Sequence, residues 1–272
     1  MNNKNLSEFP DIPVRIRDLS VFKNKISRIP DELWEAQELE ILNISMNQIG
    51  ELSNKIGNLT RLRMLDIGHN QIWEIPMEIG NLKALDSFLY LHNNQLTEIP
   101  ASIGHLTKLK YLNLSMNRLS ELPDSLGNLI QLVELKIEDN QLTCLPESLG
   151  NLSNLRELYL QNNSLKVLPK GIINHPKLRI LNLENNQINN LPTGMQEVRE
   201  LKLRNNEIEE IPRNIVNLKQ LRRIDLRGNK IKTLPIECLG LPNLERLDLR
   251  WNEDLMPPVW LDQIKEDCLV YY

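Results

Sequence analysis

Residues 109–132 read LKYLNLSMNRLSELPDSLGNLIQL, and this stretch contains the features that decide the fold. Leu112 and Leu114 alternate with polar residues, and a period of two predicts a short strand with one buried face. Asn117 follows three residues later, where the chain has to leave the strand. The Leu-Pro pair after it favours an extended exit, because proline restricts the residue that precedes it. The stretch therefore predicts a strand, a turn and a return segment.

The same frame recurs along the whole chain, and one asparagine marks each copy. Successive asparagines lie 23 or 24 residues apart, except for one step of 20. The marker residues are Asn24, Asn47, Asn70, Asn94, Asn117, Asn140, Asn163, Asn186, Asn206, Asn229 and Asn252. A fixed period of this length predicts a solenoid, in which no repeat buries its apolar face without its neighbours.

The frame L-x-x-L-x-L-x-x-N-x-L-x-x-L-P-x-x-I-G-N-L resembles that of leucine-rich repeat proteins, and the resemblance covers nearly all of the chain. The 23-residue units are similar to the Ras-suppressor-like class, which includes bacterial intracellular and effector-like proteins. The fold implied is an α/β repeat solenoid: a right-handed horseshoe with a concave parallel β-sheet and an irregular or short-helical convex side. We expect a truncated repeat and cap over 1–15, eleven repeats over 16–252, and a C-terminal cap over 253–272.

The repeated asparagine has a physical role in this frame. Its side-chain amide can donate to and accept from backbone groups buried in the turn, which would otherwise cost about 1–3 kcal/mol each. The Ile-Gly-Asn-Leu segment should close the core from the convex side in a short helical turn. In the C-terminal cap, we expect Trp260, Ile264, Leu269 and Tyr271 to cover the last repeat.

Three departures from the frame predict local differences. Ser53 stands where proline is expected. The segment 85–89 carries one extra residue, which predicts a bulge before the fourth strand. The segment 191–198 is three residues short and lacks the convex turn, and residues 9–16 are abbreviated in the same way. Such short units resemble those of secreted bacterial effectors, which favours a bacterial origin.

Composition limits the classes of function. The chain is 41% hydrophobic and 25% charged, with a net charge of -4 and a pI near 5.7, so nothing attracts it as a whole to nucleic acid or an anionic membrane. It lacks an apolar run of membrane-spanning length, and its first residues lack the apolar core of a signal peptide. Three distant cysteines do not form a disulfide framework. We expect a cytoplasmic protein, or an effector secreted without a cleaved signal peptide.

Catalytic and metal sites are poorly supported. The sequence has no phosphate loop, dinucleotide fingerprint, zinc-protease motif or nucleophile elbow. His69, His92 and Asp66 could share a metal ion, although a solvent-facing pair of histidines in a polar groove is the better interpretation. Acidic residues also gather on neighbouring strands, but an open groove does not bury a carboxylate enough for acid–base catalysis. We expect no catalytic residues, cofactor or metal.

The positions that the frame leaves free lie six, four, two and one residue before each marker asparagine, and these should point out of the concave sheet. They hold half of the twelve aromatic residues and three methionines, more than their share of the chain. The residues are Phe22, Phe88, Tyr90, Tyr111, Tyr159, Trp251, Met46, Met64 and Met116. Bulky side chains also pack along ordinary strands, but the core is already supplied by the frame. Exposed clusters of this kind favour a partner-binding surface.

Charge is sorted along the same positions. The middle repeats are acidic, with Glu134, Glu138, Asp139, Glu157 and Glu184 against Lys136. The last three repeats are basic, and Arg204, Arg227 and Arg250 form one column that ends beside Trp251. A solvated charged face would explain part of this pattern. Stacked like charges repel, however, and we expect Asp225 and Asp248 to compensate them in part.

The sequence therefore predicts a non-enzymatic module, expected to be monomeric, whose concave face binds a protein partner and not nucleic acid or a membrane. The family resemblance implies a scaffold or regulator in signalling, with a partner such as a small GTPase, kinase or phosphatase, or a host protein if the chain is a bacterial effector. Two alternatives remain: a structural or adhesion spacer, and recognition of an anionic ligand at the arginine column.

Overall fold

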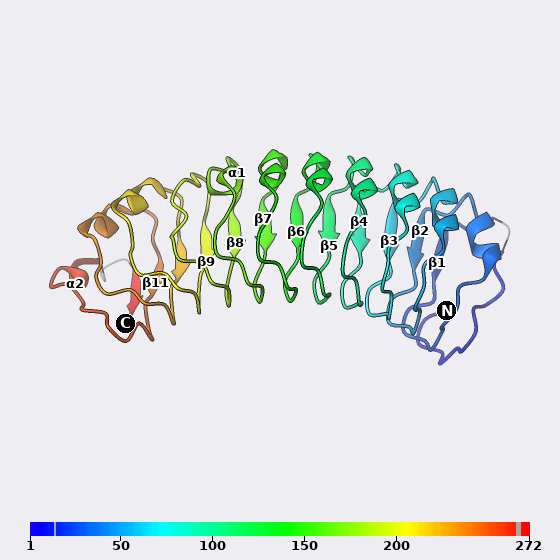
Figure 1. The fold of residues 1–272 in the computed structure, drawn as a ribbon, viewed down its shortest axis with the longest axis horizontal. Helices are drawn as coiled ribbons and strands as arrows, with labels where there is room; N and C mark the ends of the chain where they lie inside the picture. Colours follow the sequence, from blue (N-terminus) through cyan, green and yellow to red (C-terminus); the bar gives the residue numbers. More distant parts are fainter. Residues whose placement is uncertain (14, 265–267) are drawn as a thin grey trace. The chain divides into compact units, whose positions relative to one another are not determined.

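The chain forms two compact units built from one repeating combination of strand and turn. The computed structural model describes residues 1–13, 15–264 and 268–272. The units comprise Met1–Asn140 and Gln141–Tyr272. Within each unit, short parallel strands follow one another in sequence order, and short helices lie along one side (Figure 1). No helix among the described residues is long and apolar enough to cross a bilayer.

Each strand has three residues. The first unit contains β1 (Asp18–Ser20), β2 (Ile41–Asn43), β3 (Met64–Asp66), β4 (Phe88–Tyr90), β5 (Tyr111–Asn113) and β6 (Glu134–Lys136). The second contains β7 (Glu157–Tyr159), β8 (Ile180–Asn182), β9 (Glu200–Lys202), β10 (Arg223–Asp225), β11 (Arg246–Asp248) and β12 (Leu269–Tyr271). The predicted parallel solenoid of leucine-rich repeats is confirmed in both units.

The strands show the predicted alternation of buried and accessible residues. In β5, Leu112 is buried, whereas Tyr111 and Asn113 on either side are half-buried. The register Phe88↔Tyr111 and Leu89↔Leu112 keeps equivalent residues side by side from one repeat to the next. The leucines therefore form the core, and the residues between them form a continuous surface on the other side. We call this surface the open face of the sheet.

The marker asparagines behave as predicted. Asn47 is almost fully buried, and its Oδ1 accepts from the backbone N–H of Ile26 at 3.1 Å. Its Nδ2 donates to the carbonyl oxygens of Val21 and Ile44 at 3.0 and 3.1 Å. One side chain therefore joins its own turn to the turn of the preceding repeat. The same bonds recur at Asn117 and Asn229.

The residue before each marker asparagine lies in a left-handed turn, which the sequence analysis missed. Its φ is +54° in Met46, +56° in Met116 and +63° in Trp251, and Gly228 has +62° at the same place. This region favours glycine, asparagine and aspartate. The preference explains why several repeats have Asn or Asp there, and it makes Met46, Met116 and Trp251 unusual.

Short helical turns close the side opposite the open face, as predicted. In the first unit they are η1 (Asp31–Glu35), η2 (Asn54–Asn58), η3 (Met77–Asn81), η4 (Ala101–His105) and η5 (Asp124–Asn128). In the second they are η6 (Glu147–Asn151), α1 (Lys170–Ile173), η7 (Arg213–Asn217), η8 (Ile236–Gly240) and α2 (Leu261–Ile264). Ser53 replaces proline by accepting from the N–H of Lys55 through its Oγ, at 3.2 Å.

The two predicted irregularities are visible. No helix lies between β8 and β9 among the described residues, so the short segment 191–198 does lack the outer turn. The extra residue before β4 disturbs the pairing of the strands: β3 and β4 pair through two residues, whereas β4 and β5 pair through three. Asp86, in this disturbed segment, is held by an ion pair with Arg63 at 2.9 Å.

The N-terminal residues attach to the free edge of the first repeat. The amino group of Met1 donates to the carbonyl oxygen of Ser20 at 2.7 Å, and the N–H of Phe22 donates to Asn2 Oδ1 at 3.0 Å. Asn24, which has no preceding repeat, instead accepts from the N–H groups of Lys4 and Leu6. These contacts satisfy polar groups that would otherwise remain exposed at the edge. Residue 14 of the expected cap lies outside the described residues.

The C-terminal segment corrects part of the expected cap. It pairs in parallel with β11 as a further strand, β12, with Asp248 opposite Tyr271. Leu269 and Tyr271 consequently lie beside the last repeat on the open face, 62% and 37% exposed, and not over its buried core. Among the described residues of this segment, Leu261 and Cys268 are buried. Residues 265–267 lie outside the described part, so the cap boundaries stay predictions.

Candidate functional site

Five rings on the open face of the first unit form a continuous chain, which we call the aromatic ladder. Phe88 stacks on Tyr111 with 5.0 Å between ring centroids, and it packs against Tyr90 at 5.3 Å. Tyr90 meets His92 edge-on at 5.9 Å, and His92 meets His69 in the same way at 4.7 Å. Aromatic rings at these separations pack in preferred relative orientations. The ladder therefore holds its side chains in a fixed arrangement.

The ladder depends on strand register and on one glycine. Phe88 and Tyr90 point to the same side because they are two residues apart in β4, and Tyr111 is the registered neighbour of Phe88. His92 leans over the adjacent Gly68: a Cβ there would lie 2.4 Å from the His92 ring. The missing side chain lets His92 reach His69. Tyr90 and Tyr111 were predicted from spacing alone, but the histidines were not predicted to join them.

Burial shifts the pKa values of two side chains of the ladder toward their uncharged forms. Burial raises the pKa of Tyr90, and the nearby Glu134 and Asp66 act in the same direction. Burial also lowers the pKa of His92, with His69 adding to the effect. The His92 Nδ1 atom is buried and has no hydrogen-bond partner in the described structure. The ladder therefore presents half-buried rings suited to contact with apolar groups.

The other candidate residues of the first unit flank the ladder. Met46 and Met116 are 38% and 48% exposed at their left-handed turns, whereas Met64 and Phe22 are half-buried. Ile41, at the first position of β2, is 38% exposed and was missed, although it occupies one of the positions that the frame leaves free. Flexible methionines beside a rigid aromatic group are typical of adaptable binding surfaces.

The histidine pair has no third metal ligand beside it in the described part of the chain. Asp66 uses its carboxylate within the sheet, accepting from Gly68 N–H at 3.0 Å and from Ser45 Oγ at 3.1 Å. Across the described residues, no group of three histidine, cysteine or acidic side chains is placed to hold a metal ion. The histidines belong to the ladder instead.

A second cluster lies on the open face of the second unit, and we call it the arginine–tryptophan cluster. The guanidinium carbons of Arg204, Arg227 and Arg250 lie 5.0, 5.6 and 5.8 Å from the centroid of the Trp251 ring. Trp251 is 58% exposed. The sequence analysis placed it at the end of the arginine column. In the structure it contacts all three arginines, including Arg204 two repeats away.

Two carboxylates hold the cluster together. Asp248 is fully buried and accepts from Arg246 at 3.0 Å and from Arg250 at 2.7 Å. Burial alone would raise the pKa of Asp248, but the hydrogen bonds from Arg250 and Arg246 outweigh it and lower the pKa. Asp225 accepts from Arg227 Nε at 2.8 Å and raises the pKa of that guanidinium. The expected compensation of like charges is thus present.

Tyr271 of β12 also belongs to this surface and was assigned to the cap by the sequence analysis. The guanidinium carbons of Arg246 and Arg250 lie 5.1 and 5.0 Å from its ring centroid. The parallel pairing of β11 with β12 brings the arginines and the Tyr271 ring together. This contact could have been predicted only from the register of the two strands.

Tyr159 and the acidic residues are arranged more simply. Tyr159 Oη donates to Glu157 Oε2 at 2.8 Å, within β7. Lys136 pairs with Glu134 at 3.2 Å in β6, and Lys202 pairs with Glu200 at 3.3 Å in β9. These exposed or half-exposed pairs are typical of a solvated polar surface.

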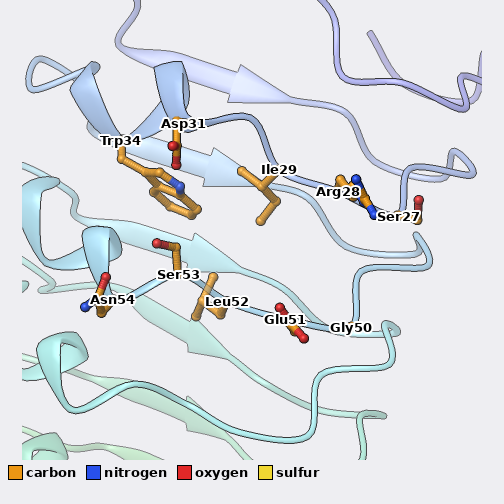
Figure 2. A pocket seen from close by; sticks show the side chains of 10 residues that line it. All are labelled: Ser27, Arg28, Ile29, Asp31, Trp34, Gly50, Glu51, Leu52, Ser53 and Asn54. Carbon is orange, nitrogen blue, oxygen red and sulfur yellow. The ribbon is translucent and has the colours of Figure 1, made fainter.

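The outer side of the first unit has a hollow of about 700 Å³ between the first two repeats (Figure 2). Trp34 lies where later outer turns have glycine, and those glycines pack tightly: a Cβ on Gly80 would lie 2.6 Å from the Ser102 carbonyl oxygen. The buried Trp34 side chain keeps η1 from packing on η2 as closely as the following turns pack on one another. Asp31 and Lys55 join the two turns across the gap at 2.8 Å.

Comparisons with known proteins agree with this architecture. Residues 15–163 match a model described as a leucine-rich repeat region, and residues 196–253 and 154–175 match two further leucine-rich repeat models. No curated protein matches the chain.

Similar solved structures include a leucine-rich repeat protein of Leptospira interrogans, with 34% identity and a TM-score of 0.87, covering 94% of this chain and 66% of that one. The plant peptide hormone receptor RGFR1, solved in complex with RGF2, has 27% identity and a TM-score of 0.76 over 89% of this chain and 43% of that one. A chain of the octameric complex of latrophilin 3, Unc5D and the FLRT2 leucine-rich repeats has 25% identity and a TM-score of 0.79, with coverages of 98% and 87%. The chain thus spans less than two thirds of the length of the first two.

Proposed function

Because the chain belongs to the leucine-rich repeat family, whose solved members include receptors in complex with peptides and proteins, we propose that it is a protein-binding module that uses the open face of its sheet. The aromatic ladder carries the proposal. Its rings lie on the side of the strands opposite the leucine core, so they are not needed to fill that core. Tyrosine is among the residues that most often carry the binding energy of protein interfaces.

The binding energy should be concentrated in the ladder. Tyr90 and Tyr111 are half-buried before any partner arrives, and their neighbours already fix the rings. These two side chains therefore lose little conformational entropy when a partner binds. Truncation of such an anchor typically costs about 2 kcal/mol or more.

Mutation of the ladder tests this proposal. A partner would be captured with the intact chain and identified by mass spectrometry, and its affinity would be measured for a Tyr90→Ala, Tyr111→Ala double variant. We expect the variant to fold with a lower melting temperature, because three ring contacts are lost. Its complex with the partner should dissociate faster, with a loss of affinity of about a hundredfold or more. Trp73→Ala is the matched control, because Trp73 is a 55% exposed aromatic residue of the same unit that lies outside the strands and their open face. Equal affinities for the double variant and wild type would place the site elsewhere.

The finer assignment is part of the same proposal: a non-catalytic scaffold or regulator in signalling, or an effector, of bacterial origin. The Leptospira structure supports the bacterial assignment, and the receptor complexes support a role in signalling. We propose that the chain acts in the cytoplasm or is exported without a cleaved signal peptide. Its three cysteines are free of disulfides, which suits a reducing compartment. Fractionation of cells that express the native gene would test the location.

A further inference from the structure

We propose that the arginine–tryptophan cluster is a subsite for a single carboxylate side chain of a protein partner, with Arg204 as the binding group and Trp251 as the apolar floor beside it. This inference rests on the proposed protein-binding function and specifies the chemistry of one part of the surface. It concerns the second unit alone, so it can fail while the role of the aromatic ladder stands.

Arg204 differs from the other arginines of the cluster because it lacks a carboxylate. Arg227 is bonded to Asp225, and Arg250 and Arg246 are bonded to Asp248. In the described part of the chain Arg204 forms no ion pair. Glu184 occupies the equivalent position in the preceding repeat, and its charge acts through space on Arg227 without a direct bond. The Arg204 Nε atom is buried and has no hydrogen-bond partner. A buried donor without an acceptor costs free energy that a ligand oxygen would recover.

Trp251 makes this guanidinium suitable for a ligand. The ring lies 5.0 Å from the Arg204 guanidinium carbon and holds the side chain in place without neutralising its charge. The exposed part of the indole offers apolar contact to whatever lies next to the carboxylate. A glutamate or aspartate followed by an apolar residue has this combination of groups.

The charge balance favours one carboxylate over a phosphate or a nucleic acid. A phosphate group carries up to two charges and three strong acceptors, and it is usually bound by several unpaired cations. Here the neighbouring cations are already paired: Lys202 with Glu200, Arg223 with Glu245, and Arg227 with Asp225. One unpaired guanidinium matches one carboxylate, with the bidentate geometry that arginine favours.

The experiment uses the intact chain and the dipeptide Ac-Glu-Leu-NH₂ as probe. Binding would be followed by the Nε–H resonance of Arg204 in a ¹⁵N-labelled sample. We expect this resonance to shift and saturate with Ac-Glu-Leu-NH₂ and to stay in place with Ac-Gln-Leu-NH₂, which has the same shape without the charge. No response, or equal responses to the two dipeptides, would overturn the proposal. Tighter binding of inorganic phosphate than of the glutamyl dipeptide would also overturn the proposal.

Two variants separate this subsite from the rest of the surface. Arg204→Gln should lower the affinity for a captured partner by about tenfold or more and slow its association. Arg118→Gln, at an exposed arginine of the first unit, should change neither. If Arg204→Gln fails to fold, Trp251→Ala serves as the second variant, because Trp251 is exposed. Trp251→Ala should abolish the response of the Arg204 resonance to the glutamyl dipeptide. If the Tyr90→Ala, Tyr111→Ala double variant lowers the affinity for the partner but Arg204→Gln does not, the assignment of the subsite is wrong and the protein-binding function stands.

Discussion

The aromatic ladder and the arginine–tryptophan cluster occupy equivalent positions of the repeat frame in different repeats, but they differ in how they are held together. The ladder is a chain of rings that lies over a glycine, and burial shifts the pKa values of Tyr90 and His92 toward their uncharged forms. The cluster is a set of guanidinium groups around one indole and a buried carboxylate. The leucines and asparagines of the frame are the same beneath both.

The difference shows that the repeat fixes where side chains stand, while the residues at the free positions decide the chemistry of the surface. Apolar contact at the ladder should govern the lifetime of a complex, because dissociation has to break that contact. Charge at the cluster should govern the rate of encounter.

The largest effect should come from the frame itself. Asn117→Ala removes an acceptor for Leu96 N–H and a donor to the Leu91 and Leu114 carbonyl oxygens, all buried. We expect the free energy of unfolding to fall by about 3 kcal/mol or more in urea melts. The adjacent Met116→Ala should cost under about 1 kcal/mol, because Met116 is exposed. Equal losses would mean that the face, and not the asparagine, stabilises the repeat.

Acid should destabilise the protein through buried histidines. His175 is fully buried; its Nδ1 accepts from Lys177 N–H and its Nε2 donates to the Leu152 carbonyl oxygen. Burial lowers its pKa, so the unfolded chain takes up the proton first, near pH 6.5. Stability should be constant above that pH and fall below it, by about 1.4 kcal/mol at most for each unit of pKa difference.

His175→Leu supplies the control for this prediction, because leucine stands at the equivalent place of regular repeats, such as Leu152. We expect it to reduce the loss of stability between pH 7 and 5 measured by thermal melts. The arginine–tryptophan cluster should be unaffected over this range, since the pKa of Asp248 is lowered further still. An unchanged pH profile in the variant would contradict the assigned cause.

A smaller structural change should separate the ladder from the fold. In Gly68→Ala the new methyl group displaces the His92 ring, which can swing away at a cost of under about 1 kcal/mol. The His92 pKa, followed by NMR, should rise toward its ordinary value as burial and the contact with His69 are lost. Affinity for a captured partner should fall while the melting temperature barely changes. A large loss of stability with intact binding would reverse this conclusion.

The smallest effect should be on the salt dependence of association. Arg204→Gln should flatten the decline of the association rate with added salt, because one unpaired positive charge has gone. Tyr90→Ala should leave that slope unchanged and alter dissociation instead. Stopped-flow measurements at several salt concentrations would resolve the two, and identical slopes in both variants would remove the distinction between the surfaces.

The sequence predicted most of the fold because the frame is repeated. Asn117 and its equivalents, the strand register and the missing outer turn near Gly194 all follow from spacing. What it could not predict depends on contacts between neighbouring repeats. His92 joins the ladder only because Gly68 leaves room for its ring. Trp251 reaches Arg204 from two repeats away, and no local pattern encodes that contact.

Other surprises arose where the frame changes. Trp34 takes the place of a glycine and opens the hollow between the first repeats, an effect that depends on packing density and not on periodicity. The segment after Asn252 lost the frame, so its return to the sheet as β12, which exposes Tyr271, could not be deduced. The role of the candidate residues in binding stays a prediction until a partner is found.

Oxidative footprinting of the partner-bound protein tests the central claim most directly. Hydroxyl radicals would be applied to the free protein and to the complex, and the modified residues identified by mass spectrometry. The account predicts that Tyr90, Tyr111 and Met116 become protected in the complex while Trp73, outside the open face, reacts as before. Protection of Trp73 with unchanged labelling of the ladder would contradict it.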